Sequence, residues 1–174
     1  AVVLLFDSHP CCSLGHKAPA RLMSRAEQER IICQMGAECI RIEFSRIMNM
    51  ECEDFVRNIL MAELNAKTVC CGFNYHFGKG GRGNVDILSD IAEAAGLELC
   101  VADAFCYKGE PVSSSRIRKC ISEGNVQDAN AMLGANFSYE LEVVGGDRLG
   151  RNLGAPTINQ YFEKDFIVPL KGVY

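Results

Sequence analysis

The sequence predicts an α/β fold built on a parallel sheet. Short apolar runs alternate with amphipathic segments from Val2 to Val101, and residues that favour helix starts and ends stand between them. Strands and helices that alternate at this spacing are joined by right-handed crossovers, which make the strands parallel. The chain has 174 residues with 48% hydrophobic content, which is enough to bury a core.

The first predicted strand, Val2–Phe6, is a continuous apolar run typical of a strand that is covered on both faces. A buried strand rarely opens a domain, so we expect the chain to begin inside a larger one. Ser24 and Glu27 then form a capping box, which predicts a helix that ends at Gly36. The second predicted strand is Cys39–Phe44.

Two more helix and strand pairs follow. The apolar residues of Glu51–Leu64 recur at helical spacing, and this predicted helix leads to a third strand, Thr68–Cys71. Another helix is expected over Val85–Ala95, followed by a fourth strand over Leu97–Val101.

The remaining chain predicts two short helices and a change of pattern. A serine-rich segment begins a helix that runs to Gly124, and Asn125 caps a second helix through Leu133, which ends at Gly134. Polar and apolar residues then alternate over Phe137–Val144, which predicts an antiparallel strand.

Composition argues against several kinds of partner. The net charge of -4 argues against a nucleic-acid surface. No apolar run approaches about 18 residues, so we expect neither a membrane span nor a signal peptide. Several of the ten cysteines stand in apolar settings, and none forms a C-x-x-C pair. This pattern favours reduced, buried thiols in a cytoplasmic protein over disulfides or a zinc site.

A loop of glycines, aromatic residues and cations follows the third predicted strand, over residues 72–84. Glycines let a backbone approach a ligand, aromatic faces stack on planar rings, and cations bind anions, so a flat ligand that carries phosphate would use all three. Gly78, Gly80 and Gly83 also spell G-x-G-x-x-G, but they lie too far from the strand end for a dinucleotide-binding motif. The remaining alternative is a surface loop whose glycines carry no function.

Two loops are expected to meet at one edge of the sheet, because ligands bind parallel sheets at the carboxyl ends of the strands. The loop after the first strand carries His9 and Pro10, and the loop after the third carries Asn74, Tyr75 and Phe77. These residues predict a common crevice. Taken alone, His9 is equally well explained as a residue that anchors the turn before Pro10.

A second candidate site opens the helix after the fourth strand. Ser114 and Ser115 stand at the start of this helix, and Arg118 follows one turn later. Backbone N–H groups at a helix start carry partial positive charge, and the side chains add hydrogen-bond donors, so the segment predicts an anion site. The alternative is an ordinary helix cap followed by solvated basic residues.

These motifs together resemble a known family. Residues 72–84, the serine motif Val112–Arg118, the helix pair Ile117–Leu133 and the segment Phe6–Pro10 are similar to bacterial bifunctional riboflavin kinase/FAD synthetase, in the same order. The resemblance implies a Rossmann-like nucleotidyltransferase domain over residues 1–135 that lacks its first strand. It also implies an incomplete β-barrel riboflavin kinase domain over residues 136–174.

The tail extends the resemblance. Residues 146–159 are similar to the kinase motif of the family, although Ala155 and Ile158 depart from it, and Pro169–Tyr174 resembles the next strand. By resemblance, Thr157 and Asn159 would contact Mg²⁺ and the phosphates of ATP.

For the adenylyltransferase, the resemblance implies that the phosphate of FMN attacks the α-phosphate of ATP, which gives FAD and pyrophosphate with Mg²⁺ assisting. The residues that would hold the flavin are His9, Pro10, Asn74, Tyr75 and Phe77, and those that would contact ATP are Ser114, Ser115 and Arg118. The family's H-x-G-H segment, which acts on the phosphates of ATP, has no counterpart in this sequence. The parent protein would also phosphorylate riboflavin, but we expect the chain alone to be inactive in both reactions.

Two other classes of function remain open from the sequence. One is a non-catalytic module that retains flavin or nucleotide without turnover. The other, on the glycine pattern alone, is a dinucleotide-binding oxidoreductase domain.

Overall fold

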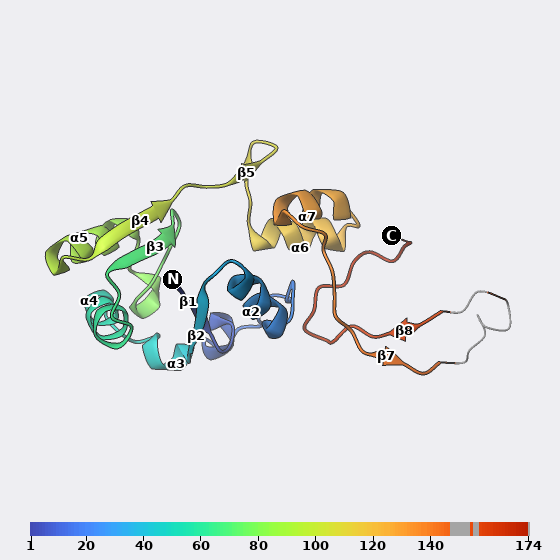
Figure 1. Cartoon of the computed structure of the whole chain (residues 1–174), viewed down its shortest axis with the longest axis horizontal. Helices are drawn as coiled ribbons and strands as arrows, with labels where there is room; N and C mark the ends of the chain where they lie inside the picture. Colours follow the sequence, from blue (N-terminus) through green and yellow to red (C-terminus); the bar gives the residue numbers. More distant parts are fainter. Residues whose placement is uncertain (147–153, 155–156, 174) are drawn as a thin grey trace. The chain divides into compact units, whose positions relative to one another are not determined.

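The computed structural model describes residues 1–146, 154 and 157–173 (Figure 1). The chain divides into two compact units. Unit 1 consists of Ala1–Ala18 and Glu38–Cys106, and unit 2 consists of Pro19–Ala37 and the residues from Tyr107 onward. Helix α2 (Arg25–Gln34) therefore shares a unit with the C-terminal part of the chain.

Unit 1 contains two pairs of parallel strands. The pairs are β1 (Val2–Phe6) with β2 (Glu38–Ile42), and β3 (Thr68–Gly72) with β4 (Glu98–Ala102). The predicted α/β arrangement with parallel strands is confirmed. The described strands form separate two-stranded sheets, so a single Rossmann-like sheet stays a prediction. The second strand is also shorter than predicted, because Phe44 begins the short helix α3 (Phe44–Ile47) and packs its ring against Phe6.

Of the helices of unit 1, those near residues 51–64 and 85–95 were predicted from the sequence, whereas the short helix Pro10–Ser13 lies in an expected loop. The first is the short α1 (Pro10–Ser13), then α4 (Cys52–Asp54) continues into the π-helix η1 (Phe55–Glu63), and α5 (Val85–Ala95) follows the central loop. Asn84 caps α5 by accepting a hydrogen bond from the N–H of Ile87 at 2.9 Å. Gly96 ends the helix in the left-handed region, with a φ of 67°.

One hydrophobic core holds unit 1 together. Its most buried side chains come from η1 and α5, where Val56, Ile59 and Leu88 have at most 1% of their surface exposed. Leu4 from β1 and Val69 from β3 pack against the same cluster. Both strand pairs therefore pack against one hydrophobic core, whose most buried side chains come from η1 and α5.

Besides α2, the described part of unit 2 contains two short helices and two small strand pairs. The helices are α6 (Ser114–Ser122) and α7 (Val126–Leu133), and the paired strands are β5 (Cys106–Tyr107) with β6 (Glu110–Pro111) and β7 (Val143–Val144) with β8 (Asn159–Gln160). The helices pack through buried Ile117, Ile121, Ala129 and Met132. The predicted caps are present: Ser24 opens α2, Asn125 opens α7, and Gly134 ends α7 with a φ of 70°.

The predicted strand Phe137–Val144 is wrong over most of its length, since only Val143–Val144 pairs with another strand. The aromatic side chains explain the difference. Tyr139 packs edge-on against Phe137 at 4.6 Å and Phe162 at 4.7 Å between ring centroids, and its hydroxyl donates to the carbonyl of Ile167. These side-chain contacts hold residues 137–142 in place, and no strand pairs with the backbone of these residues.

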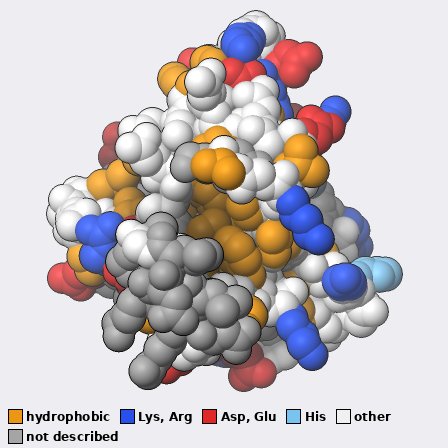
Figure 2. Space-filling view, turned by 90° about the vertical axis from the view of Figure 1, so that its right-hand side faces the viewer, with side chains coloured by type: hydrophobic (Ala, Val, Ile, Leu, Met, Phe, Trp, Pro, Cys, Tyr) orange, Lys and Arg blue, Asp and Glu red, His pale blue; other side chains and the backbone are white. Residues whose placement is uncertain are grey.

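The strand expected at Pro169–Tyr174 is not formed by residues 169–173, which lie in loop. Exposed hydrophobic side chains of unit 2 include Val143, Ile158, Tyr161, Val168 and Leu170. Figure 2 shows hydrophobic side chains gathered on the side of the chain that carries β7 and β8. Apolar surface of this kind remains uncovered by the described residues of unit 2.

Leu88 provides a test of the core of unit 1. The change Leu88→Ala removes a side chain with 0% of its surface exposed, and we expect a loss of about 2–5 kcal/mol in the free energy of unfolding. Ile87→Ala is the matched control on the same helix, because Ile87 is 38% exposed and should cost about 1 kcal/mol or less. Urea unfolding followed by circular dichroism measures both. Equal losses would show that α5 does not face the core as described.

Candidate functional site

The central loop of unit 1 is folded back on itself. It leaves β3 at Gly72 and closes through two backbone hydrogen bonds, from the N–H of Phe77 to the carbonyl of Gly83 at 3.1 Å and from the N–H of Gly83 to the carbonyl of Phe77 at 2.9 Å. The N–H of Lys79 donates to the carbonyl of Met50 at 2.7 Å, which attaches the tip to the segment before α4. The glycines and cations thus lie in an ordered turn.

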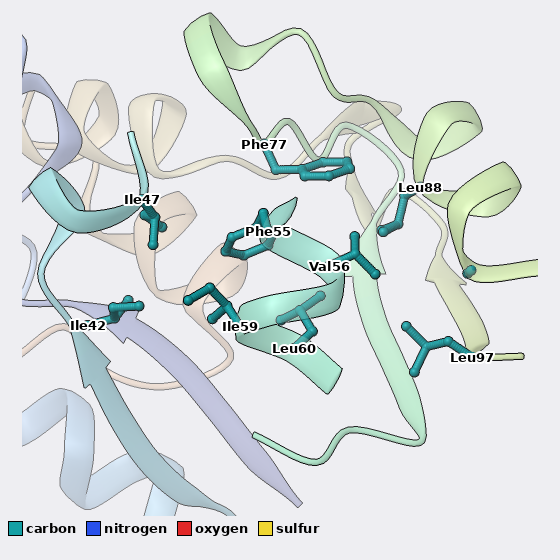
Figure 3. Packing of buried hydrophobic residues seen from close by; sticks show 10 residues of the cluster. Ile42, Ile47, Phe55, Val56, Ile59, Leu60, Phe77, Leu88 and Leu97 are labelled. Carbon is teal, nitrogen blue, oxygen red and sulfur yellow. The ribbon is translucent and has the colours of Figure 1, made fainter. Parts of the chain in front are cut away.

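Phe77 anchors this loop in the core. Its ring is 6% exposed, stacks parallel to Tyr75 at 5.6 Å between centroids, and contacts Phe55 at 5.8 Å. Figure 3 shows Phe77 and Phe55 on neighbouring segments, with Val56 and Leu88 beside them. Burial, and to a smaller extent Cys71, raises the pKa of Tyr75 to about 12. The structure brings Tyr75 and Phe77 together, but it gives the Phe77 ring a packing role.

The glycines of the G-x-G-x-x-G pattern are explained by packing. A Cβ at Gly83 would lie 2.7 Å from the ring of Phe77, and one at Gly78 would lie 2.6 Å from the Sγ of Cys52. Gly80 has no atom within 4 Å of such a Cβ, but its φ of +66° favours glycine. The strand does not run directly into a helix here, so the local geometry differs from that of a dinucleotide-binding turn.

Glu51 holds the two cations of the loop. Its carboxylate accepts from Nη2 of Arg82 at 2.8 and 3.1 Å and lies 3.9 Å from Nζ of Lys79. All three side chains are more than half exposed, so the pairing stabilises the loop weakly and leaves the cations accessible to a stronger anion. Sequence reasoning missed Glu51, because it stands more than twenty residues before the loop and matches no motif.

The other predicted flavin residues of unit 1 lie on the surface. Asn74 is exposed, and its backbone oxygen lies 3.0 Å from Nδ1 of His76. Nδ1 of His9 accepts a hydrogen bond from the N–H of Cys11 at 3.2 Å, so His9 caps α1, and Pro10 is its first residue. This contact is the anchoring role that was the alternative for His9. A role of His9, Pro10 or Asn74 in flavin binding stays a prediction.

The serine motif opens α6 in unit 2. Ser113 is the capping residue and accepts from the N–H of Arg116 at 3.2 Å, while Ser114 and Ser115 stand exposed in the first turn. Nε of Arg118 donates to the carbonyl of Ala20 at 2.6 Å. No described residue bonds to its Nη1 or Nη2, so the charged end keeps donors for a ligand. The structure brings these three predicted residues to one helix end.

Arg116, which the sequence did not single out, fixes the approach to this helix. Its guanidinium donates to the carbonyls of Glu110 at 2.8 Å and Tyr107 at 2.9 Å, and it lies 5.8 Å from the ring centroid of Tyr107. Backbone carbonyls are partners that no sequence pattern marks. Arg116 therefore ties the β5 and β6 hairpin to the start of α6.

The kinase-like motif is described only in part. Thr157 is exposed, and Asn159 begins β8 and pairs with Val144. Residues 147–153, 155 and 156 lie outside the described part of the chain, and with them the predicted departure at Ala155. The roles of Thr157 and Asn159 toward Mg²⁺ and ATP stay predictions.

All ten cysteines are free thiols. In the described ranges, no group of three or more His, Cys, Asp or Glu side chains is arranged to hold a metal ion. Nor does any helix among those residues have the length and apolar character needed to cross a membrane.

The ionisation of Tyr75 should make the stability of unit 1 depend on pH between about 10 and about 12. In this window the unfolded chain has released the phenol proton and the folded state still holds it, so raising the pH favours unfolding. The contribution is complete below about pH 10 and falls by at most about 2–3 kcal/mol toward pH 12. Tyr75→Phe cannot ionise at this position.

Urea unfolding of the wild type and of Tyr75→Phe, at about pH 9 and about pH 11.5, measures this contribution. We expect the wild type to lose more stability than the variant between these two values. Parallel losses in the two proteins would mean that the hydroxyl of Tyr75 is not buried in the folded state.

Comparison with known proteins agrees along the whole chain. The FAD synthetase family matches residues 1–116, and the riboflavin kinase family matches residues 133–174. The chain is similar to bifunctional riboflavin kinase/FMN adenylyltransferases, with 30% identity to that of Escherichia coli (strain K12), 30% to that of Listeria monocytogenes and 32% to that of Buchnera aphidicola subsp. Schizaphis graminum.

These alignments cover 99% of this chain and 55% to 56% of each relative, so the chain spans about half the length of the relatives that it matches. The crystal structure of a macrolide-efflux protein from Streptococcus pneumoniae is also similar, with a TM-score of 0.88 and 29% identity over 99% of this chain and 57% of that chain. Because the match to one family spans two thirds of the residues and includes the central loop, the chain belongs to the FAD synthetase family.

Proposed function

We propose that the protein containing this chain transfers AMP from ATP to FMN, giving FAD and pyrophosphate, and also phosphorylates riboflavin to FMN. The observation that carries the proposal is the FAD synthetase match over residues 1–116, which includes the central loop and the exposed Ser114 and Ser115 at the start of α6. The names of the relatives state both activities.

The proposed transfer needs positioning more than it needs a covalent intermediate. A phosphate oxygen of FMN attacks the α-phosphorus of ATP, and the bond from this phosphorus to the oxygen that bridges to the β-phosphate breaks, so pyrophosphate leaves. The protein must hold the two phosphates in line and offset their negative charge. Mg²⁺ takes most of its ligands from water and substrate phosphates, so it would be bound mainly through ATP.

The flavin is proposed to bind at the central loop. Asn74 offers an exposed amide with both donor and acceptor groups, at the end of β3 where parallel sheets bind ligands. Tyr75 is half-buried and rests on Phe77, so Phe77 would support flavin binding by fixing the loop. His9 and Pro10 would contribute from the loop after β1.

The phosphates of ATP are proposed to bind at the start of α6. The exposed hydroxyls of Ser114 and Ser115 stand where the N–H groups of the first turn carry partial positive charge. Arg118 adds two terminal nitrogens that no described residue uses. In the kinase-like tail, Thr157 and Asn159 would bind Mg²⁺ and nucleotide.

The same proposal extends to the fold. The two strand pairs share one core, which supports their being parts of one Rossmann-like sheet in a domain over residues 1–135. The antiparallel pair of β7 and β8 supports the start of a β-barrel kinase domain over residues 136–174. The ten free thiols and the net charge of -4 support a cytoplasmic protein without a nucleic-acid partner.

Asn74→Ala should weaken FMN binding about tenfold, because loss of one hydrogen bond in a binding site costs on the order of 1 to 2 kcal/mol. Asn58→Ala is the matched control, since Asn58 is an exposed residue of η1 away from the loop. Titration of FMN by quenching of its fluorescence measures both. Equal affinities in the two variants would remove Asn74 from the flavin site.

Arg118→Ala should raise the ATP concentration needed for half-maximal rate by roughly tenfold or more, because a charge-assisted bond to phosphate contributes about 1.5–3 kcal/mol. Lys119→Ala is the control from the next position on the same helix. The FMN concentration needed for half-maximal rate should change little in either variant. If Arg118→Ala raised this FMN concentration and left the ATP concentration unchanged, the assignment of the two sites would be reversed.

The activity itself is tested in the longer protein, which carries this chain together with the further length found in the relatives. Incubation with FMN, ATP and Mg²⁺ should give FAD and pyrophosphate in equal amounts, measured by chromatography. Incubation with riboflavin and ATP should give FMN. Binding of FMN and ATP without any FAD would support the non-catalytic module instead.

A further inference from the structure

Two thiols of unit 1 stand opposite each other on neighbouring strands. Cys70 of β3 pairs in register with Cys100 of β4, and both are exposed. In the strand pairs that the structure describes, no other paired position carries two cysteines. Neither thiol belongs to the proposed flavin or nucleotide sites.

The position of this pair brings the two sulfur atoms together. Neighbouring strands lie about 4.7–4.9 Å apart, and disulfides join Cα atoms about 4.4–6.8 Å apart, so the backbone spacing already suits a cross-link. Residues at paired positions also lie on the same face of a sheet. Thr68 and Glu98, two positions earlier, show this directly, since the hydroxyl of Thr68 donates to Oε2 of Glu98 at 2.7 Å.

Cys70 and Cys100 are direct register partners on these parallel strands, so their side chains stand side by side on one face of the pair. Cys71, the next residue of β3, lies on the opposite face and packs against the core of unit 1. Cys106 lies beyond the end of β4 and pairs with no cysteine. The strand register therefore singles out Cys70 and Cys100 from the four cysteines of this region.

We propose that Cys70 and Cys100 form an oxidation site, a dithiol that hydrogen peroxide converts to a disulfide between β3 and β4. One sulfur attacks a peroxide oxygen, the O–O bond breaks, and water leaves, which gives a sulfenic acid. The second sulfur then attacks the first, the S–O bond breaks, and a second water leaves as the S–S bond forms. Two thiols lose two electrons and two protons in total, and one peroxide is reduced to two waters.

The second step makes the site selective. Any exposed thiol can meet peroxide, but a sulfenic acid closes to a disulfide quickly only where another thiol is held in contact, because that step is then intramolecular. Partial desolvation and the neighbouring Cys100 thiol raise the pKa of Cys70, which slows the first step, so the selectivity of the site comes from the second step. The cross-link would lie two residues before Gly72, where the central loop begins.

Peptide mapping of the full chain tests the proposal without any measurement of FAD formation. Trypsin releases residues 68–79, which hold Cys70 and Cys71, and residues 83–108, which hold Cys100 and Cys106. After treatment with peroxide and alkylation of the remaining thiols, we expect these two peptides as one species. Its mass should equal that of the two peptides, each alkylated only at Cys71 or Cys106, minus two hydrogen atoms, and reduction should separate it.

Single variants identify which sulfur atoms form the disulfide. Each peptide holds a second cysteine, Cys71 or Cys106, whose replacement serves as the control. The linked species should disappear in Cys70→Ala and in Cys100→Ala, and it should persist in Cys71→Ala and in Cys106→Ala. Circular dichroism establishes that each variant is folded. A link that survives either of the first two changes, or peroxide products that consist only of separate sulfinic or sulfonic acids, would overturn the proposal.

Discussion

Burial of the Phe77 ring is the contact on which the candidate site of unit 1 depends. The ring joins the loop to η1 through Phe55 and to the surface through Tyr75, with centroid separations of 5.8 and 5.6 Å. Burial of an aromatic side chain of this size contributes on the order of 1.5–3 kcal/mol to the stability of the folded state. The loop is therefore held by an apolar contact, and its polar residues remain at the surface.

The glycines around Phe77 follow from this contact. Gly83 passes so close to the ring that any side chain there would overlap it, and Gly78 passes equally close to Cys52. Two of the three glycines in the G-x-G-x-x-G pattern are thus required by packing of the loop against its own anchor. A motif that matches a dinucleotide-binding fingerprint by spelling alone has a different physical cause here.

In unit 2 the corresponding constraint is the set of arginine contacts with backbone carbonyls. Arg116 donates to the carbonyls of Tyr107 and Glu110, and Arg118 donates to that of Ala20. Hydrogen bonds from a charged guanidinium are stronger than neutral ones, so these bonds stabilise the approach to α6. Nε of Arg118 therefore supports the fold, while no described residue bonds to its Nη1 or Nη2.

The sequence by itself determined the features that depend on neighbouring residues: the caps at Ser24 and Asn125, the helix ends at Gly96 and Gly134, and the order of the four parallel strands. Capping needs only a side chain and an N–H group three residues away, so it is visible in the sequence. The family resemblance was also carried by short motifs.

Only the tertiary structure decided which side chains are buried and which cations are already paired. Phe77 was expected to face a ligand and instead lies in the core, Glu51 proved to hold Arg82, and Tyr139 kept its segment out of a strand. Each of these outcomes depends on a partner distant in sequence, and no local pattern records which distant groups will meet when the chain folds.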